Sequence, residues 1–153
     1  MKIRRIQTFQ VDLPLVEGSY RWSGGKSVDV FDSTVVRIET DEGITGIGES
    51  DVNPWIARAC IEAPSTHTMG LGLKDMLIGE NPLDTERLWE KLYVGSCMNG
   101  RRGAVINAMG AIDMALWDIK AKPLGSPSMN CSAGCAESAW CVIPTWAEPI
   151  PMP

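Results

Sequence analysis

The chain has 153 residues, which is enough for one domain with a buried core. Hydrophobic residues make up 44% of it and charged residues 22%, the ordinary balance of a soluble globular protein. The net charge of −5 excludes the basic surface that attracts nucleic acids and anionic membranes, and no stretch approaches the roughly 20 apolar residues that span a bilayer. The sequence therefore predicts a cytoplasmic protein that binds neither nucleic acid nor membrane.

Alternating apolar and polar residues predict strands in the first part of the chain. The alternation runs over residues 9–13, where Pro14 ends it, and again over residues 36–40. Residues 41–43 form a tight turn in which Gly43 supplies a positive φ, and residues 44–48 form the returning strand. Together these segments predict a three-stranded antiparallel meander.

A long connection, residues 16–26, joins the first two predicted strands. It places three glycines beside large aromatic and basic side chains, namely Tyr20, Arg21 and Trp22. Such groups on a glycine-containing loop suit contact with a ligand. The alternative is a surface loop whose aromatic side chains pack on the sheet. The sequence leaves both interpretations open.

Helical spacing replaces the alternation after Asn53. Residues 55–62 predict a short helix that ends before Pro64. A second helix is predicted to begin at a Ser65 or Thr66 cap, run to Ile78 and stop at Gly79. Asp84 caps a predicted third helix, whose apolar side is formed by Leu88, Trp89 and Leu92.

The strongest helical pattern covers residues 102–121. Apolar residues recur there at spacings of three and four and form one stripe: Val105, Ala108, Met109, Ile112, Leu116 and Ile119. Pro123 and Gly125 end the helix. Strands followed by helices, without alternation between the two, indicate an α+β domain: a three-stranded antiparallel meander followed by a helical bundle.

The cysteines and the single histidine give no metal motif. Cys60 and Cys97 stand apart and are predicted to be small buried hydrophobic residues. Cys131, Cys135 and Cys141 form no CxxC pair and lie far in sequence from His67. The sequence therefore predicts no metal ligand and no catalytic residue in this chain.

Three stretches resemble one enzyme family. Residues 40–49, TDEGITGIGE, resemble a hairpin that ends in G-x-G-E, and residues 77–82, LIGENP, resemble an L-x-G-x-[DN]-P turn. Residues 108–122, AMGAIDMALWDIKAK, resemble the long helix signature almost position by position. With these motifs in this order, residues 1–127 resemble the N-terminal capping domain of the mandelate racemase/muconate lactonizing enzyme family of the enolase superfamily.

The resemblance implies a division of labour between two domains. The cap closes over a modified TIM barrel and shapes the substrate pocket, which makes Tyr20, Arg21, Trp22, Glu49 and Ser50 the candidates for contact with the substrate. The barrel supplies the carboxylate ligands of Mg²⁺ and the bases that remove a proton α to a substrate carboxylate, and Mg²⁺ stabilises the resulting enediolate. Loss of a β-hydroxyl then gives dehydration, whereas reprotonation gives racemisation or epimerisation.

Motifs near the predicted pocket point to two substrates. Residues 20–26 resemble the subgroup that acts on hydroxyproline-type amino acids and their betaines. Residues 100–103, GRRG, resemble acid-sugar dehydratases instead. The two indications differ, so the sequence leaves a hydroxy amino acid and an acid sugar both open.

The catalytic barrel is absent from this sequence. Residues 128–153 leave no room for the roughly 200 residues that such a barrel needs, and no K-x-K base motif occurs. We therefore expect a cap that is truncated before the barrel and inactive alone, with exposed barrel-facing surface through which it self-associates. The alternative is a small non-catalytic binding or interaction module that keeps the cap fold.

The tail, residues 128–153, has the composition of an irregular and poorly ordered segment, without Lys or Arg and with three cysteines. A barrel entry of the family type, V-Y-E-L-L-G-G, can be written GUC-UAU-GAA-CUG-CUC-GGC-GGG. Loss of the first G gives UCU-AUG-AAC-UGC-UCG-GCG-GG, which encodes Ser-Met-Asn-Cys-Ser-Ala and begins a Gly, the sequence found at residues 128–134. The sequence therefore predicts that the tail is a frameshifted reading of an ordinary barrel entry.

Overall fold

A computed structural model of the chain describes residues 1–13 and 31–125. It contains a three-stranded antiparallel sheet in the order β1-β2-β3, formed by β1 (Ile3–Leu13), β2 (Phe31–Thr40) and β3 (Thr45–Ser50). The turn between β2 and β3 holds Gly43 at a φ of 84°. The predicted meander is confirmed. The expected ligand loop with Tyr20, Arg21 and Trp22, and the expected tail from residue 128, lie outside the described residues.

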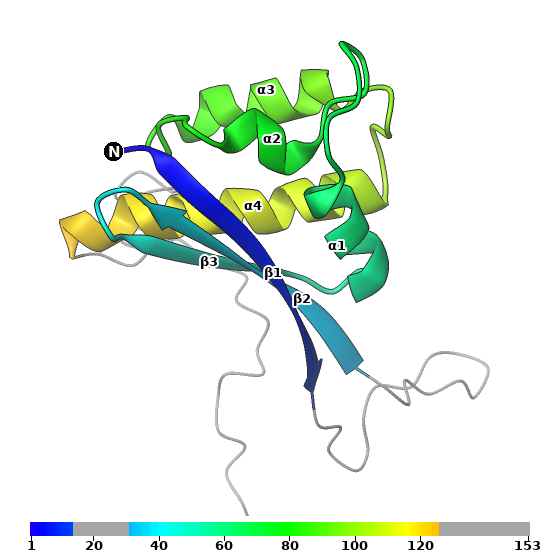
Figure 1. The fold of residues 1–153 in the computed structure, drawn as a ribbon. Helices are drawn as coiled ribbons and strands as arrows, with labels where there is room; N and C mark the ends of the chain where they lie inside the picture. Colours follow the sequence, from blue (N-terminus) through cyan, green and yellow to red (C-terminus); the bar gives the residue numbers. More distant parts are fainter. Residues whose placement is uncertain (14–30, 126–153) are drawn as a thin grey trace, which may run out of the picture.

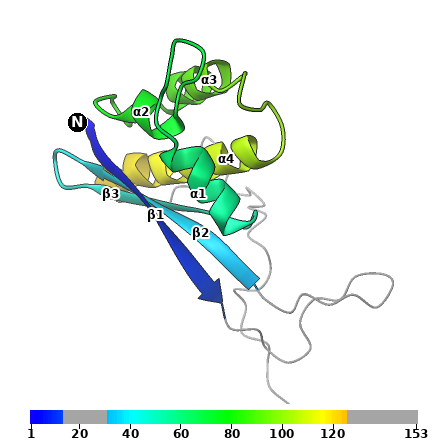
Figure 2. The same cartoon turned by 45° about the vertical axis from the view of Figure 1, so that its right-hand side comes forward.

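Four α-helices cover one face of this sheet (Figure 1). They are α1 (Pro54–Glu62), α2 (Leu73–Leu77), α3 (Thr85–Gly95) and α4 (Ala104–Ala121), and a short 3₁₀ turn, η1 (Lys122–Leu124), follows α4. The rotated view shows α2 and α3 stacked above the layer of α1 and α4 (Figure 2). The predicted α+β fold, a meander followed by a helical bundle, is confirmed.

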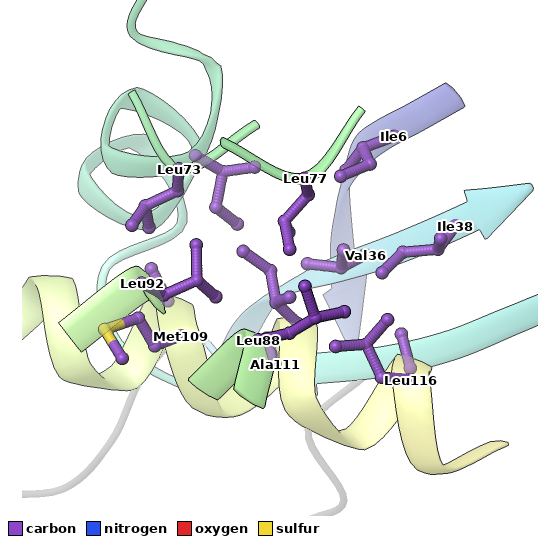
Figure 3. Close-up of a cluster of buried hydrophobic side chains, with 14 of the residues drawn as sticks. Ile6, Val36, Ile38, Leu73, Leu77, Leu88, Leu92, Met109, Ala111 and Leu116 are labelled. Atoms are coloured by element: carbon purple, nitrogen blue, oxygen red, sulfur yellow. The ribbon is translucent and has the colours of Figure 1, made fainter. Parts of the chain in front are cut away.

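The core lies between the sheet and α4. Every residue of the stripe predicted on the long helix is buried, and α4 begins two residues later than predicted, after Gly103. Figure 3 shows Met109 and Leu116 of this stripe in one cluster with Val36 and Ile38 of β2 and with Leu88 and Leu92 of α3. The spacing of three and four therefore predicts the correct buried face. This stripe of α4 is buried because the sheet and α3 both pack against it.

The buried side chains of β1 lie near its start, and not over residues 9–13, where apolar and polar residues alternate most clearly. Ile3 and Ile6 are buried, whereas Phe9 and Leu13 are exposed. Phe9 pairs with Val35 and therefore lies on the face of the sheet opposite to Val36 and the helices. The alternation over residues 9–13 marks the face turned away from the core.

The second helix is much shorter than predicted, since α2 begins at Leu73 rather than after Ser65 or Thr66. The preceding segment folds back on itself: Ser65 N donates to Asp75 Oδ2 at 2.6 Å, and Gly72 N donates to Ser65 Oγ at 2.9 Å. A Cβ at Gly72 would lie 2.0 Å from Ala63 O, so the chain there has the close backbone approach that glycine permits. Ser65 therefore caps a loop and not a helix.

The cysteine prediction is correct for one residue only. Cys60 is partly buried and packs against the core cluster. Cys97 is exposed, because it follows Ser96, the C-cap of α3, in the turn that leads away from the core.

Candidate functional site

One end of the sheet collects the residues expected to face a ligand. There β1 ends at Leu13, which pairs with Phe31 at the start of β2, and β3 ends at Ser50, which pairs with Thr34. Residues 14–30 connect Leu13 to Phe31, so the predicted ligand loop joins the fold at this end. Glu49 and Ser50 reach the same end from β3.

The two candidates on β3 differ in exposure. The Glu49 side chain is exposed and the Ser50 side chain is buried, and the hydroxyl of Ser50 has no hydrogen-bond partner in the described part of the chain. The alternation of β3 explains the difference, because Ser50 lies on the face of Gly46 and Gly48 against the helices while Glu49 lies on the opposite face. Of the two candidates on β3, Glu49 is the one that presents a charged group to solvent.

Side chains of β2 and α1 fix the segment that follows β3. Ser33 Oγ donates to Ser50 O and Thr34 Oγ1 donates to Pro54 O, each at 3.1 Å and both buried. Asn53 caps α1, since its Oδ1 accepts hydrogen bonds from the N–H groups of Trp55 and Ile56. The segment from Glu49 to Asn53 is therefore held at both ends.

Sequence reasoning missed these supporting residues. Asn53 carried a usable signal, because Asn immediately before Pro is the typical start of a helix. Ser33 and Thr34 carried none, since a hydroxyl in a strand gives no indication of the backbone carbonyl that it will reach.

An open groove of about 670 Å³ lies beside this segment. The segment after β3 contributes Glu49, Ser50 and Asp51 to its wall, and α3 contributes Trp89. The remainder of the lining comes from the outward side of α4: Ile106, Asn107, Gly110, Ala111, Asp113 and Met114. The groove thus joins the end of the sheet to the helix surface and combines apolar side chains with three carboxylates.

Asp113 is the carboxylate in this groove that is partly removed from water. Burial raises its pKa, and a hydrogen bond with Trp117 opposes that shift only in part. Within the described residues, none of Glu49, Asp51 and Asp113 forms an ion pair. The groove is therefore acidic and without a neutralising cation from the described part of the chain.

Asp118, one turn beyond Asp113 on the same helix, has the opposite environment. Its Oδ2 accepts a hydrogen bond from Ile47 N at 2.9 Å and pairs with Lys122 Nζ at 2.8 Å. Lys122 Nζ also reaches Thr45 O. Asp118 has a structural role on the edge of β3, which leaves Asp113 as the carboxylate of α4 without a cationic partner among the described residues.

The described residues contain no group of three His, Cys, Asp or Glu side chains arranged to hold a metal ion. His67 is exposed, and its Nδ1 accepts a hydrogen bond from Met69 N within a turn.

Across residues 1–13 and 31–125, no helix has the length and apolar character needed to cross a membrane.

Comparison with known proteins gives consistent matches. The sequence model of the family described as "Mandelate racemase / muconate lactonizing enzyme, N-terminal domain" matches residues 25–130. The chain is 39% identical to a cis-3-hydroxy-L-proline dehydratase from Roseibium aggregatum over 142 residues, which cover 90% of this chain and 35% of the relative. It is 35% identical over 128 residues to a D-galactonate dehydratase from Variovorax paradoxus, covering 83% of this chain and 26% of that enzyme.

The fold is shared with solved structures of the same kind. A protein from Roseovarius nubinhibens, described as a mandelate racemase/muconate lactonizing enzyme and solved in complex with magnesium, matches with a TM-score of 0.70 at 32% identity. The match covers 90% of this chain and 35% of that one. The chain thus spans about a third or less of the length of the relatives that it matches.

Proposed function

This chain belongs to the mandelate racemase/muconate lactonizing enzyme family, and we propose that it is the substrate-capping domain of an enzyme that removes the proton α to a carboxylate. The observation that carries the proposal is the match of residues 25–130 to the family's N-terminal domain, in a chain that spans about a third of its relatives. A cap contributes shape and contacts to the pocket, and the chemistry belongs to the remainder of the enzyme.

The geometry at the end of the sheet supports this role. A capping segment has to be held in place without a ligand, and buried hydrogen bonds from Ser33 and Thr34 fix the segment after β3 in that way. Glu49 and Asp51 are the exposed charged groups on this segment, and we assign a direct contact with the substrate to Glu49, which lies at the end of β3. Ser50 supports that contact from the buried face.

The magnesium ion of the proposed reaction does not fit the described residues of this chain, which offer no group of three ligands. Mg²⁺ prefers several oxygen ligands in octahedral geometry. We therefore assign its ligands, and the bases of the reaction, to the part of the longer relatives that this chain does not span. On this basis the isolated chain is inactive, and it will not exchange the α-proton of a carboxylate substrate with solvent.

Two substrate classes follow from the relatives, a hydroxy amino acid such as cis-3-hydroxy-L-proline and an acid sugar such as D-galactonate. The acidic groove favours the first, because an amino acid carries a cationic nitrogen that carboxylates attract and an acid sugar carries none.

A domain exchange tests the proposal. Residues 1–125 of this chain replace the matching part of the Roseibium dehydratase, and dehydration of cis-3-hydroxy-L-proline and of D-galactonate is measured with and without Mg²⁺. The proposal expects Mg²⁺-dependent turnover of at least one substrate and a raised KM after Glu49→Gln, with Glu90→Gln on the exposed side of α3 as the control. A folded exchange protein that turns over neither substrate contradicts it.

We also propose that residues 128–153 are a frameshifted reading of a barrel entry, as the codon comparison predicts. Resequencing of the gene beyond the codon for Pro127 tests this. An intact downstream frame that encodes barrel strands is the expected result, and unrelated DNA at that place excludes it.

A further inference from the structure

A second cavity, of about 280 Å³, lies between the helices and shares no lining residue with the acidic groove. Its walls come from the end of α1, the loop of residues 63–72, the turn after α3 and the start of α4. These segments can be followed in Figure 2. The proposed capping function makes no use of this cavity.

Hydrogen bonds hold the walls of this cavity in place. Asn99 Nδ2 donates to Leu71 O at 3.1 Å, which ties the turn after α3 to the loop of residues 63–72. Within that loop Gly72 N donates to Ser65 Oγ, and a Cβ at Gly72 would meet Ala63 O at 2.0 Å. The cavity is therefore formed before any ligand enters, which lowers the cost of ordering the site on binding.

The lining of the cavity is largely apolar and carries no charge. Leu73 and Val105 contribute buried apolar side chains, and Cys60 is partly buried. Among the described residues, those that line the cavity include no Asp, Glu, Lys, Arg or His. Burial also raises the pKa of the Cys60 thiol, which keeps it uncharged near neutral pH. A charged ligand would lose its hydration here without gaining a counter-charge, so the cavity selects an uncharged one.

Ser96 adds a hydrogen-bond donor to this lining. The residue is only 1% exposed, and its hydroxyl donates to Met109 Sδ at 3.7 Å. A thioether sulfur is a weak acceptor. An oxygen atom of a ligand would therefore be a stronger acceptor for the same hydroxyl.

We infer that this cavity is a second ligand site, which takes a small uncharged molecule with an apolar ring or chain and one carbonyl or ether oxygen that accepts from Ser96. The size agrees, because an apolar cavity of about 150 Å³ is enough for benzene and this one is larger. The inference does not depend on the proposed capping function, since the two sites have no lining residue in common.

Alkylation of Cys60 in the 153-residue chain gives the first test, with cyclohexanone as the probe. Iodoacetamide is added at alkaline pH, and peptide mapping by mass spectrometry measures each thiol separately. At a concentration about ten times its dissociation constant the ketone should slow alkylation of Cys60 about tenfold, because only the empty cavity exposes the thiol. Cys97, which is exposed and does not line the cavity, is the control within the same chain and should react at an unchanged rate. Absence of saturable protection at Cys60, or equal protection of both thiols, overturns the inference.

Two variants test the site itself. Ser96→Ala removes the donor and should raise the dissociation constant of cyclohexanone about threefold to tenfold. Ala63→Leu fills the mouth of the cavity from the exposed end of α1 and should abolish the protection by the ketone. Ala59→Leu makes the same change one turn earlier, at an exposed residue outside the lining, and should leave the dissociation constant unchanged. Protection that persists in Ala63→Leu would place the ketone elsewhere and would overturn the inference.

Charged rings of the same size test the chemistry of the ligand. Cyclohexanecarboxylate and protonated cyclohexylamine keep the ring and add a negative or a positive charge, so neither should protect Cys60 at concentrations at which cyclohexanone does. Equal protection by either of them would mean that the lining does not select an uncharged molecule, and the inference would be wrong.

Discussion

At the scale of single residues, Asp118 and Lys122 protect the exposed edge of the sheet. Among the described strands β3 pairs with β2 on one side only, and on its other side Asp118 accepts from Ile47 N while Lys122 donates to Thr45 O. We predict that Asp118→Ala lowers the free energy of unfolding by about 1–3 kcal/mol, since it leaves a backbone donor and a lysine without their partner. Urea unfolding monitored by circular dichroism measures the change.

Two further variants separate charge from hydrogen bonding at this site. Asp118→Asn keeps an oxygen that can accept from Ile47 N and loses the pair with Lys122, so its cost should be smaller than that of Asp118→Ala. Glu90→Gln, on the exposed side of α3, should have almost no effect. Equal costs for Asp118→Asn and Asp118→Ala would mean that the charge alone is important.

Glu80 makes the stability of the domain depend on pH. Hydrogen bonds from Lys91 and then Arg87 hold the pKa of Glu80 below its usual range. The unfolded chain, in which this pKa is about 4.3, therefore takes up the proton first as the pH falls. The stabilisation by Glu80 is complete above that value and is lost as the pH falls through the lower folded-state pKa.

Glu80→Gln should reduce this dependence. We expect a loss of a few tenths to about 1 kcal/mol at pH 7, because the ion pairs with Lys91 and Arg87 are partly exposed, and a smaller loss near pH 3. Urea unfolding at the two pH values gives both numbers. An equal loss at the two values would show that the charge of Glu80 does not contribute.

At the scale of elements, the fold depends on the close approach of β3 and α4. A Cβ at Gly48 would lie 2.0 Å from Ala111 O, and one at Gly46 would lie 2.0 Å from Ala115 O. Gly48→Ala should therefore separate the strand from the helix and cost at least about 1–3 kcal/mol. Gly110→Ala, on the outward side of α4 with nothing within 4 Å, should stabilise the chain by up to about 1 kcal/mol.

Thermal unfolding of the two variants tests this pair of predictions. The same chemical change is made in both, so opposite signs would reflect the close contact at Gly48 and the open, helical position of Gly110. A harmless Gly48→Ala would mean that β3 and α4 have room to separate.

Local pattern accounts for the elements that the sequence predicted well. The stripe on α4 repeats from Val105 to Ile119, and the turn at Gly43 requires a positive φ, so both can be identified without knowledge of the neighbours. The extent of α2 could not be predicted, because Ser65 caps a loop whose shape depends on the contact of Gly72 with Ala63.

The candidate site was predictable only in part, for the same reason. Glu49 and Ser50 are candidates from the sequence, because Glu49 ends a motif of the family and Ser50 follows it at the end of the strand. The roles of Ser33 and Thr34 depend on which backbone carbonyl the register of β2 brings within reach. The place of Asp113 in the groove could not be predicted, because Glu49 and Asp51, which line the groove with it, come from a distant part of the chain.

At the scale of the whole molecule, the sheet has an apolar face that the four helices leave uncovered. Ile47 exposes 54% of its surface and Phe9 exposes 42%, and both lie on the face turned away from Val36. Exposed apolar groups on one face favour association when no partner covers them. We predict that the free chain self-associates through this face as its concentration rises.

Sedimentation velocity with three lysine variants tests where the contact lies. Ile47→Lys and Phe9→Lys should each weaken association by roughly tenfold or more, because burying such a side chain contributes about 1.5–3 kcal/mol. Met98→Lys, at an exposed residue in the turn after α3, should leave association unchanged. If Met98→Lys weakens association and the two sheet variants do not, the sheet face is not the contact. Should the sheet variants alone weaken it, the contact lies on the opposite side of the sheet from the core.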